Sequence, residues 1–394
     1  MTPVQLNPPV LVPGGSGGVH QFLPVLHRGD AVGEHTIALR ELLRARGIRS
    51  EIYVEIPSQS GPRGDVAGSH PAGGGAPDLS TRPMLAYRED CEPGDVLVYQ
   101  MATASGIVAF LEERAECLVV NYHNITPARF FAPWDNPVAR LQLRAREELV
   151  RLAARADLGI AVSEFNRVDL LEVGFRSTLA IPPIVAMSQH SVVPAENECA
   201  DRAAGDDGAR WLAVGRLAPN KAIEDVLVAL LAYRRRHDPL AHLDVIGRVA
   251  IASYAGALEA YAAELGIARA VRFYGHVTTS RLAACYSTAD VVVTASEHEG
   301  FCAPLVEAMS FGVPVCAYAA GAVPEVLGSA GLLFDTKNPV EIADTVHRVI
   351  ADPVLRESLA QAGRERLGEL QIAQAGSMLV DALLALRSDA VEAS

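Results

Sequence analysis

The sequence predicts an α/β protein of two facing Rossmann-like domains, each a doubly wound parallel sheet, with a cleft between them. Three observations support this fold class. Short apolar runs, typical of buried parallel strands, alternate with helical patterns along the chain. The alternation breaks once, over 186–209, where periodicity is lost and Pro and Gly residues appear. A chain of 394 residues is also too long for one hydrophobic core.

The first half contains five runs that we expect to form strands, at 19–26, 51–56, 95–101, 117–122 and 158–162. An amphipathic helix with Leu39, Leu42 and Leu43 on its apolar face follows the first run. Another helix is expected over 137–156. Residues 1–18 and 57–80 are rich in Gly and Pro, which is typical of a flexible leader and a surface loop. We expect this domain to span 1–190.

The second half repeats the alternation. Its expected strands are 211–214, 243–246, 271–274, 291–294, 313–317 and 332–334. We expect this domain to span 205–369, and a last helix, about 370–394, to pack back on the first domain. Ligands of such sheets bind beyond the carboxyl ends of the strands, so binding and catalytic residues are expected there.

Composition excludes several classes of protein. A net charge of −13 argues against general nucleic-acid binding. No stretch reaches the length expected of a transmembrane helix, and the N-terminus lacks the pattern of a signal peptide. The six cysteines show no CxxC spacing, so we expect small buried hydrophobes in a cytoplasmic protein, without disulfides or a zinc site.

The most informative segment begins at Glu299, where a glycine turn leads from a buried strand into a helix that carries Glu307. Such a turn presents backbone N–H groups to an anion, and the two carboxylates flank that anion site. Arg216 and Lys221 bracket the turn after the strand 211–214 and could bind a diphosphate. The alternatives are solvated charges in a loop and a water-exposed helix carboxylate.

Two more glycine turns follow strands. One contains Gly247, and the other contains Tyr274, Gly275 and His276. The aromatic ring and the glycine at the end of 271–274 could frame a nucleobase. A core strand followed by an ordinary turn explains them equally well.

Taken together, these motifs resemble the retaining glycosyltransferases of family 4, which have the GT-B fold. The resemblance rests on Arg216…Lys221, on Glu299-x7-Glu307, and on the Gly-x-Pro-Val and Gly-x-x-Pro-Glu motifs that follow, and it covers most of 210–340. It implies that Arg216 and Lys221 bind the donor diphosphate, that Glu299 contacts the transferred sugar and that Glu307 holds the ribose. The implied donor site also includes Gly215, Gly247, Tyr274, Gly275, His276, Gly300, Phe301, Cys302 and Leu305.

The first domain resembles the family more loosely. Its counterpart of the family's glycine loop is the segment with Gly29, Asp30 and Gly33, which could face the donor phosphates or the acceptor. Asp30 departs from a plain Gly-Gly turn and could bind an acceptor hydroxyl, or could simply begin a helix. His123 follows a strong strand, and the resemblance implies that it touches the donor sugar or assists transfer. Ser163 is a weaker candidate.

The resemblance therefore implies a retaining, metal-independent hexosyltransferase whose catalytic residues are Glu299, His123, Arg216 and Lys221. The nucleotide sugar is a substrate, with GDP-mannose favoured and UDP-hexoses next, and no cofactor or metal is expected. The acceptor is a hydroxyl of a glycan, a lipid-linked molecule or a small molecule in carbohydrate biosynthesis. The alternative is a non-catalytic nucleotide-sugar-binding partner subunit.

The helix expected over 137–156 bears on the location of the protein. Arg140, Arg144, Arg151 and Arg155 share one face of it. Relatives that glycosylate lipid carriers dock on membranes through basic faces, so peripheral contact with the inner face of the membrane is one interpretation. An arginine-rich soluble surface is the other.

Overall fold

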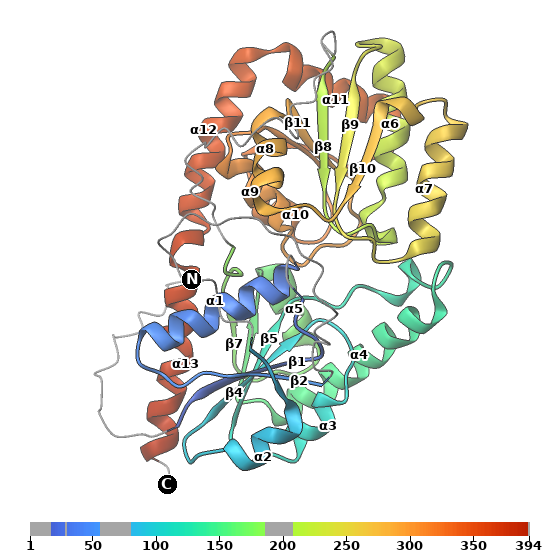
Figure 1. Cartoon of the computed structure of the whole chain (residues 1–394). Coiled ribbons are helices and arrows are strands. Elements are labelled where there is room, and N and C mark those ends of the chain that lie inside the picture. The colour runs from blue at the N-terminus through green and yellow to red at the C-terminus, as the bar shows by residue number, and fades with distance from the viewer. Residues whose placement is uncertain (1–16, 28–29, 56–79, 186–207, 393–394) are drawn as a thin grey trace.

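The computed structural model describes residues 17–27, 30–55, 80–185 and 208–392. Figure 1 shows two lobes, each built on a sheet with helices on both of its faces. The expected flexible leader, the loop over 57–80 and the linker over 186–209 lie almost entirely outside the described residues.

The first sheet has seven strands in the order β3-β2-β1-β4-β5-β6-β7, and its hydrogen-bonded neighbours are all parallel. The five expected strands are present, one with the predicted bounds and four somewhat shorter, whereas β3 and β7 were not predicted. The strands are β1 (Val19–Leu23), β2 (Ile52–Val54), β3 (Arg82–Pro83), β4 (Val96–Met101), β5 (Cys117–Tyr122), β6 (Leu158–Ala161) and β7 (Thr178–Ala180).

Alternate residues of these strands enter two different cores, because side chains of a strand point to opposite faces. Leu97 and Tyr99 of β4 pack with α3 and α4, whereas Val96 and Val98 pack with α1 and with a helix from the far end of the chain. The helices of this domain are α1 (Ala31–Ala45), α2 (Tyr87–Asp90), α3 (Ile107–Glu112), α4 (Asn136–Arg155) and α5 (Glu164–Glu172).

The second sheet has six parallel strands in the order β10-β9-β8-β11-β12-β13. This order reverses between β8 and β11, as in a doubly wound dinucleotide-binding sheet. The strands are β8 (Arg210–Val214), β9 (His242–Ile246), β10 (Val271–Gly275), β11 (Val291–Thr294), β12 (Val315–Tyr318) and β13 (Gly331–Phe334). All six were predicted.

Helices cover both faces of this sheet. Trp211 and Ala213 pack against α6 (Ile223–Arg236), α7 (Ala252–Glu264) and α11 (Pro339–Ala351). Leu212, their neighbour in β8, packs on the opposite face against α8 (Thr279–Thr288), α9 (Ala303–Ser310) and α10 (Val323–Leu327). The connections that leave β8 and β11 therefore run to opposite faces of the sheet.

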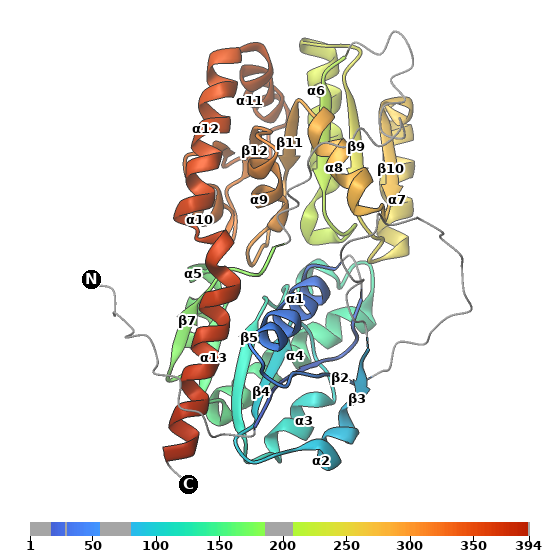
Figure 2. The same cartoon turned by 60° about the vertical axis from the view of Figure 1, so that its left-hand side comes forward.

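The chain returns to the first domain at its end. α12 (Pro353–Glu369) lies along the second domain, and α13 (Ala375–Glu392) continues down the side of the first, as Figures 1 and 2 both show. Gln371, with φ of 53°, is in the left-handed conformation between them. Leu379, Val380 and Leu383 of α13 are buried in the same core as α1 and β4.

This segment qualifies the expectation about transmembrane helices. Residues 353–387 are long and apolar enough to span a membrane by length and composition, with a mean hydropathy of 1.2 over their most apolar stretch, of which 33% is buried. The apolar side chains of α13 have a use within the fold, because they complete the core of the first domain. Length and composition alone are therefore weak evidence for a membrane span here.

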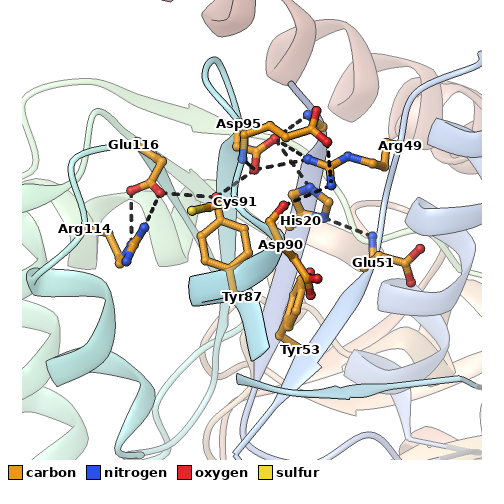
Figure 3. Close-up of polar contacts among 12 residues, drawn as sticks. His20, Arg49, Glu51, Tyr53, Tyr87, Asp90, Cys91, Asp95, Arg114 and Glu116 are labelled. Carbon is orange, nitrogen blue, oxygen red and sulfur yellow. Dashed lines mark hydrogen bonds and ion pairs between the residues drawn. The ribbon is translucent and has the colours of Figure 1, made fainter. Parts of the chain in front are cut away.

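Buried charges organise the amino-terminal edge of the first sheet, on the side away from the second domain (Figure 3). Asp95, which precedes β4, accepts hydrogen bonds from Tyr87, Arg49 and the N–H groups of Gly18 and Glu92. Burial alone would raise the pKa of Asp95, but the His20 imidazole and these N–H groups lower it far below its usual range. The cluster is a structural anchor for the ends of β1, β2 and β4.

One expectation about the cysteines is wrong. Cys285 in α8 is disulfide-bonded, although the sequence shows no paired spacing. Cys91, Cys302 and Cys316 carry free thiols. The absence of a CxxC pattern therefore did not exclude a disulfide.

Candidate functional site

The candidate site lies where β8 and β11 adjoin. These neighbouring strands send their connections to opposite faces, and the carboxyl ends of strands at such a switch point are where open α/β sheets bind ligands. Lys221 follows β8 at the end of a 3-10 turn, η3 (Pro219–Lys221), and Glu299 follows β11. Two sequence motifs far apart in the chain thus meet at this point.

Lys221 and Glu299 form a partly buried ion pair. The ammonium Nζ lies 2.5 Å from Oε1 of Glu299, and the side chains are 14% and 9% exposed. The sequence assigned these residues to two parts of one ligand, and the structure brings them into direct contact. Charges that are partly removed from solvent interact strongly with a polar ligand. A ligand with phosphate and hydroxyl groups could therefore replace this ion pair, its phosphate binding the ammonium and its hydroxyl groups binding the carboxylate.

Asn220 was not identified from the sequence, although it ties the two loops together. Its side-chain amide donates to the backbone carbonyl of His298 at 3.0 Å, and the backbone carbonyl of Asn220 accepts from the N–H of Glu297 at 2.8 Å. Asn220 is buried, so these bonds fix the relative position of the Lys221 and Glu299 loops. The signal available in the sequence was its place directly before Lys221.

Glycines let three strand-end loops pack on one another. A Cβ on Gly247 would lie 1.8 Å from the carbonyl oxygen of Gly215, so only glycine fits there. The N–H of Gly247 donates to the carbonyl of Gly275, and that of Gly215 donates to Ile246, each at 2.9 Å. These contacts gather the ends of β8, β9 and β10 into one surface. Gly215, Gly247 and Gly275 thus have a structural function besides the donor contacts predicted for them.

Arg216 is placed differently from Lys221. It is exposed and makes no ion pair with any residue that the structure describes. Arg248, in the adjacent loop, lies 3.7 Å from the carboxylate of Asp30 in the first domain. Arg216 follows β8 and Arg248 follows β9, so both residues lie at the same edge of the second sheet as Lys221. They add positive charge to this edge.

The loop after Glu299 is closely packed. A Cβ on Gly300 would lie 2.5 Å from that of Asn124 and 2.9 Å from the carbonyl oxygen of His123, both in the first domain. Phe301 and Cys302 are buried, and Cys302 begins α9 with φ of 69°. Burial raises the pKa of the Cys302 thiol well above its ordinary value, so this group is not a thiolate nucleophile.

Backbone strain concentrates at this junction. Four non-glycine residues among those described have positive φ, and three of them flank the site: Ala222 after Lys221, Cys302 after Gly300, and Asn124 after His123. Such conformations cost roughly 1–3 kcal/mol each and persist where the surroundings impose them, commonly at binding sites. The strain supports the location of the site independently of any motif.

Glu307 lies further along, in α9. Its Oε2 accepts a hydrogen bond of 2.6 Å from the hydroxyl of Tyr286, which stacks on Phe311. Burial raises the pKa of Glu307, and the hydrogen bond from Tyr286 partly offsets this rise. The carboxylate is thus oriented by a neighbour that the sequence did not reveal, rather than fully exposed to water.

The other donor-site candidates differ in exposure. Tyr274 is half-buried, with the Arg281 guanidinium 4.9 Å from its ring centre, and His276 is exposed. Leu305 is fully buried in the core, and its N–H donates to the carbonyl of Cys302. Tyr274 and His276 are accessible to a ligand, whereas Leu305 supports the loop from beneath.

His123 belongs to a buried polar network in the first domain. Its Nε2 lies 2.6 Å from Oε1 of Gln100, whose amide nitrogen donates to Gln21 at 2.8 Å. Gln21 in turn donates to the carbonyl of Thr36 in α1. Because a backbone carbonyl can only accept, this sequence of bonds orients both amides and places the proton of His123 on Nε2. Burial lowers the pKa of His123 to about 4, so the ring is neutral near pH 7.

The candidate acceptor loop is only partly described. Gly29 lies outside the described residues. Asp30 caps α1 by accepting from the N–H of Val32 at 3.1 Å, while its other oxygen faces Arg248. Gly33 is needed for packing, since a Cβ there would lie 1.9 Å from the carbonyl of His27. Asp30 therefore caps a helix and also faces the second domain.

Two hydrogen bonds join the domains next to Glu299. The hydroxyl of Ser163 donates to the carbonyl of Gly300 at 2.6 Å. The imidazole of His298 lies 3.0 Å from the side-chain oxygen of Asn124. Ser163, the weaker candidate, thus contacts the site directly, and Asn124 is a site residue that the sequence did not single out.

The described side chains include no group of three or more His, Cys, Asp or Glu residues arranged to hold a metal ion. What the site does offer is a lysine, an exposed arginine, a carboxylate and a neutral imidazole around the junction of two domains. That combination can neutralise an anionic group and hydrogen-bond hydroxyl groups beside it.

Comparison with known proteins gives the class and the family. The model of "Glycosyl transferases group 1" matches residues 196–366. D-inositol 3-phosphate glycosyltransferase of Nocardiopsis dassonvillei is 30% identical over 295 residues, 72% of this chain and 68% of that protein. The enzyme of the same name from Geodermatophilus obscurus is 29% identical over 80% of this chain and 72% of its own length.

Solved structures match nearly the whole chain. Sucrose-phosphate synthase from Thermosynechococcus elongatus has a TM-score of 0.72 at 20% identity, covering 94% of this chain and 99% of its own. HepE from Anabaena, solved in complex with UDP and glucose, has a TM-score of 0.69 at 17% identity, covering 94% and 100%. Fold and sequence similarity together define this protein as a glycosyltransferase with the GT-B fold. The chain belongs to the group 1 glycosyl transferase family.

Proposed function

We propose that this enzyme transfers a hexose from a nucleotide sugar to an acceptor hydroxyl with retention of configuration and without a metal ion. The observation that carries the proposal is the Lys221–Glu299 pair at the switch point of the second sheet. The pair combines the two functions that a sugar diphosphate demands, a cation for the phosphates and a carboxylate for sugar hydroxyls.

In this proposal, binding of the donor breaks the ion pair between Lys221 and Glu299. Phosphate oxygens take the ammonium of Lys221, with Arg216 free to add a bidentate contact, so no divalent cation is required for charge neutralisation. The carboxylate of Glu299, released from Lys221, accepts hydrogen bonds from hydroxyls of the transferred sugar. Glu307, held by Tyr286, binds the ribose diol.

The leaving diphosphate gains negative charge as its bond to the sugar breaks. Lys221 and Arg216 stabilise that charge more strongly in the transition state than in the ground state. The free-energy barrier to transfer is therefore lower. Glu299 acts as a sugar ligand rather than as a nucleophile. His123 is neutral and carries its proton on Nε2, so its other nitrogen, Nδ1, accepts a hydrogen bond from a hydroxyl at the junction.

The donor and acceptor follow from resemblance and from the names of the relatives. GDP-mannose is our first donor, and UDP-hexoses are next; the complexes of HepE with UDP and glucose make UDP-glucose a necessary comparison. D-inositol 3-phosphate, which the relatives' names give, is the first acceptor to test. Free and lipid-linked sugars follow.

The test measures release of the nucleoside diphosphate from GDP-mannose, UDP-glucose and UDP-N-acetylglucosamine, with and without each acceptor, in buffer containing EDTA. Acceptor-dependent release with one donor, and an α-linked product from an α-linked donor by NMR, is the expected result. Tight binding of nucleotide sugars without turnover would identify a non-catalytic binding subunit instead. Activity that EDTA abolishes and Mg²⁺ restores would remove metal independence.

We also propose a cytoplasmic location. The basic face of α4 gives limited support to membrane contact, because three of its arginines face carboxylates of this chain: Arg144 with Glu148, Arg151 with Glu112, and Arg155 with Asp157. Arg140 is exposed. Sedimentation with anionic vesicles tests the point, and binding that Arg140→Ala and Arg151→Ala weaken together would favour a peripheral membrane enzyme.

A further inference from the structure

One carboxylate of the second domain is bound by backbone of the first. Glu325, in α10, accepts the N–H of Glu164 on Oε1 at 2.7 Å and the N–H of Phe165 on Oε2 at 2.9 Å. These groups are the first two N–H donors of α5, which no residue of that helix can satisfy. A carboxylate at a helix N-terminus also interacts favourably with the helix dipole.

The start of α5 is also the point where the first domain holds the Glu299 loop. Ser163 caps α5 by accepting from the N–H of Asn166, and its hydroxyl donates to the carbonyl of Gly300. The buried amide of Asn166 lies against Gly300 as well, since a Cβ on that glycine would lie 2.8 Å from its nitrogen. Any shift of α5 therefore moves a group bonded next to Glu299.

α10, the helix that carries Glu325, is also bonded to Glu299 within the second domain. The N–H of Ala322, directly before α10, donates to the carbonyl of Glu299 at 3.0 Å. A Cβ on Gly321 would lie 2.6 Å from that same oxygen. The guanidinium of Arg366 donates to the carbonyls of Glu325 and Val326, which fixes α10 against α12.

These contacts close a circuit through both domains: Glu299 and Gly300, then Ser163 and α5, then Glu325 and α10, and back to Glu299 through Ala322. We propose that Glu325 is a positioning residue, which holds the catalytic carboxylate of Glu299 in register with the first domain. The residue touches neither reacting group, so its effect passes through α5 and α10. This inference rests on the proposed function for the importance of Glu299.

Glu325→Gln is the informative variant, because it keeps the size of the side chain while turning an N–H donor toward one of the two N–H groups of α5. Hydrogen exchange of the ligand-free, full-length protein should increase at Glu164 and Phe165 by about tenfold or more, as expected for the loss of a charge-assisted hydrogen bond. Exchange should also increase at Ala322, whose N–H is bonded to Glu299. Unchanged exchange at all three amides would overturn the proposal.

Turnover provides the second measurement. Glu325→Gln should lower kcat about tenfold, with a smaller change in the KM for the donor. Ser163→Gly removes the hydroxyl bonded to Gly300 while keeping an acceptable helix cap. Because both variants break one circuit, the double variant should be little worse than either single variant. Effects that multiply to within roughly a factor of two would show two independent sites and contradict the coupling.

Glu357→Gln is the matched control, since Glu357 lies on α12 and its ion-pair partner among the described residues is Arg364, in a largely exposed contact. It should leave exchange at α5 and turnover unchanged. A Glu325→Gln protein with the parent's kcat but faster exchange would limit Glu325 to a structural contact. Absence of transfer with every donor would refute the proposed function, while the exchange results would still decide whether α5 and Ala322 are coupled.

Discussion

The ammonium of Lys221 lies 2.5 Å from a carboxylate oxygen of Glu299, across the boundary between β8 and β11. Both residues belong to one domain, but the loop of Glu299 is held in part by the other, through Ser163 and Asn124. The reacting end of the proposed donor site is therefore not a property of the second domain alone.

Glu299→Gln and Lys221→Ala should each lower turnover by at least about a hundredfold, because each removes charge that stabilises the departing diphosphate or the sugar. Neither should unfold the protein, since the site is only partly buried. Initial rates and circular dichroism of both variants test this. Glu297→Gln, two positions away and paired with Lys337 outside the ion pair, is the control and should retain normal turnover.

Tyr286→Phe should weaken nucleotide binding without slowing the chemical step. The substitution removes the hydrogen bond that orients Glu307, worth about 1.5–3 kcal/mol when the acceptor is charged. Calorimetric titration with the nucleoside diphosphate should show a Kd raised roughly tenfold, with kcat at saturating donor nearly unchanged. An equal loss with donor and with free nucleotide is expected; a loss in kcat alone would place Glu307 elsewhere in the reaction.

His123 predicts a pH dependence of stability. Its pKa of about 4 in the folded protein lies below the ordinary value near 6.5, so the unfolded chain binds the proton first as pH falls. The stability contributed by the neutral ring is present above about pH 6.5 and is lost as pH falls toward 4, on the order of 3 kcal/mol in all.

His123→Gln should flatten this slope in urea unfolding measured between pH 7 and 4. The slope should not vanish, because burial also lowers the pKa of His35. His276→Gln, at an exposed position, is the control and should leave the slope unchanged. A slope identical in His123→Gln and the parent would contradict the neutral state of His123.

Asp95→Asn should destabilise the protein more than His123→Gln does, although Asp95 lies far from the proposed reaction site. Its carboxylate is fully buried among Arg49, Tyr87 and two N–H groups, and removing a buried ionic partner costs about 3–5 kcal/mol. The depressed pKa means that this stability is present above about pH 4 and is lost as pH falls through the folded value.

Chemical unfolding at pH 7 and pH 3 would show the difference between Asp95→Asn and the parent shrinking in acid. Asp381→Asn, whose exposed carboxylate pairs with Arg46, should change stability by less than about 1 kcal/mol at either pH. An equal difference at both pH values would show that packing, rather than charge, is responsible.

The sequence was sufficient for the main strands of both sheets, because buried parallel strands are short, continuous apolar runs. It missed β3 and β7 for a physical reason. β3 is two exposed residues, Arg82 and Pro83, and β7 is three half-buried ones at the edge of the sheet. Edge strands of this kind pair through backbone groups, so their side chains carry little of the signal.

The candidate site was predictable only where chemistry coincides with a strand end, as at Lys221 and Glu299. Gln100, Asn124 and Glu325 were not singled out for their contacts, because an ordinary polar side chain gains its importance from a partner. Those partners are distant in sequence: 23 positions separate Gln100 from His123, and 174 separate Asn124 from His298.

The return of α13 to the first domain has a consequence for synthesis of the chain. The core that contains Val19 and Val96 is completed by Leu379 and Leu383, so the second domain is inserted between two parts of the first. During translation, the second domain can fold as soon as it emerges from the ribosome, whereas the first keeps an uncovered apolar face until α13 has been made. A ribosome that stalls in α12 would thus expose a nearly finished domain to aggregation and to chaperones.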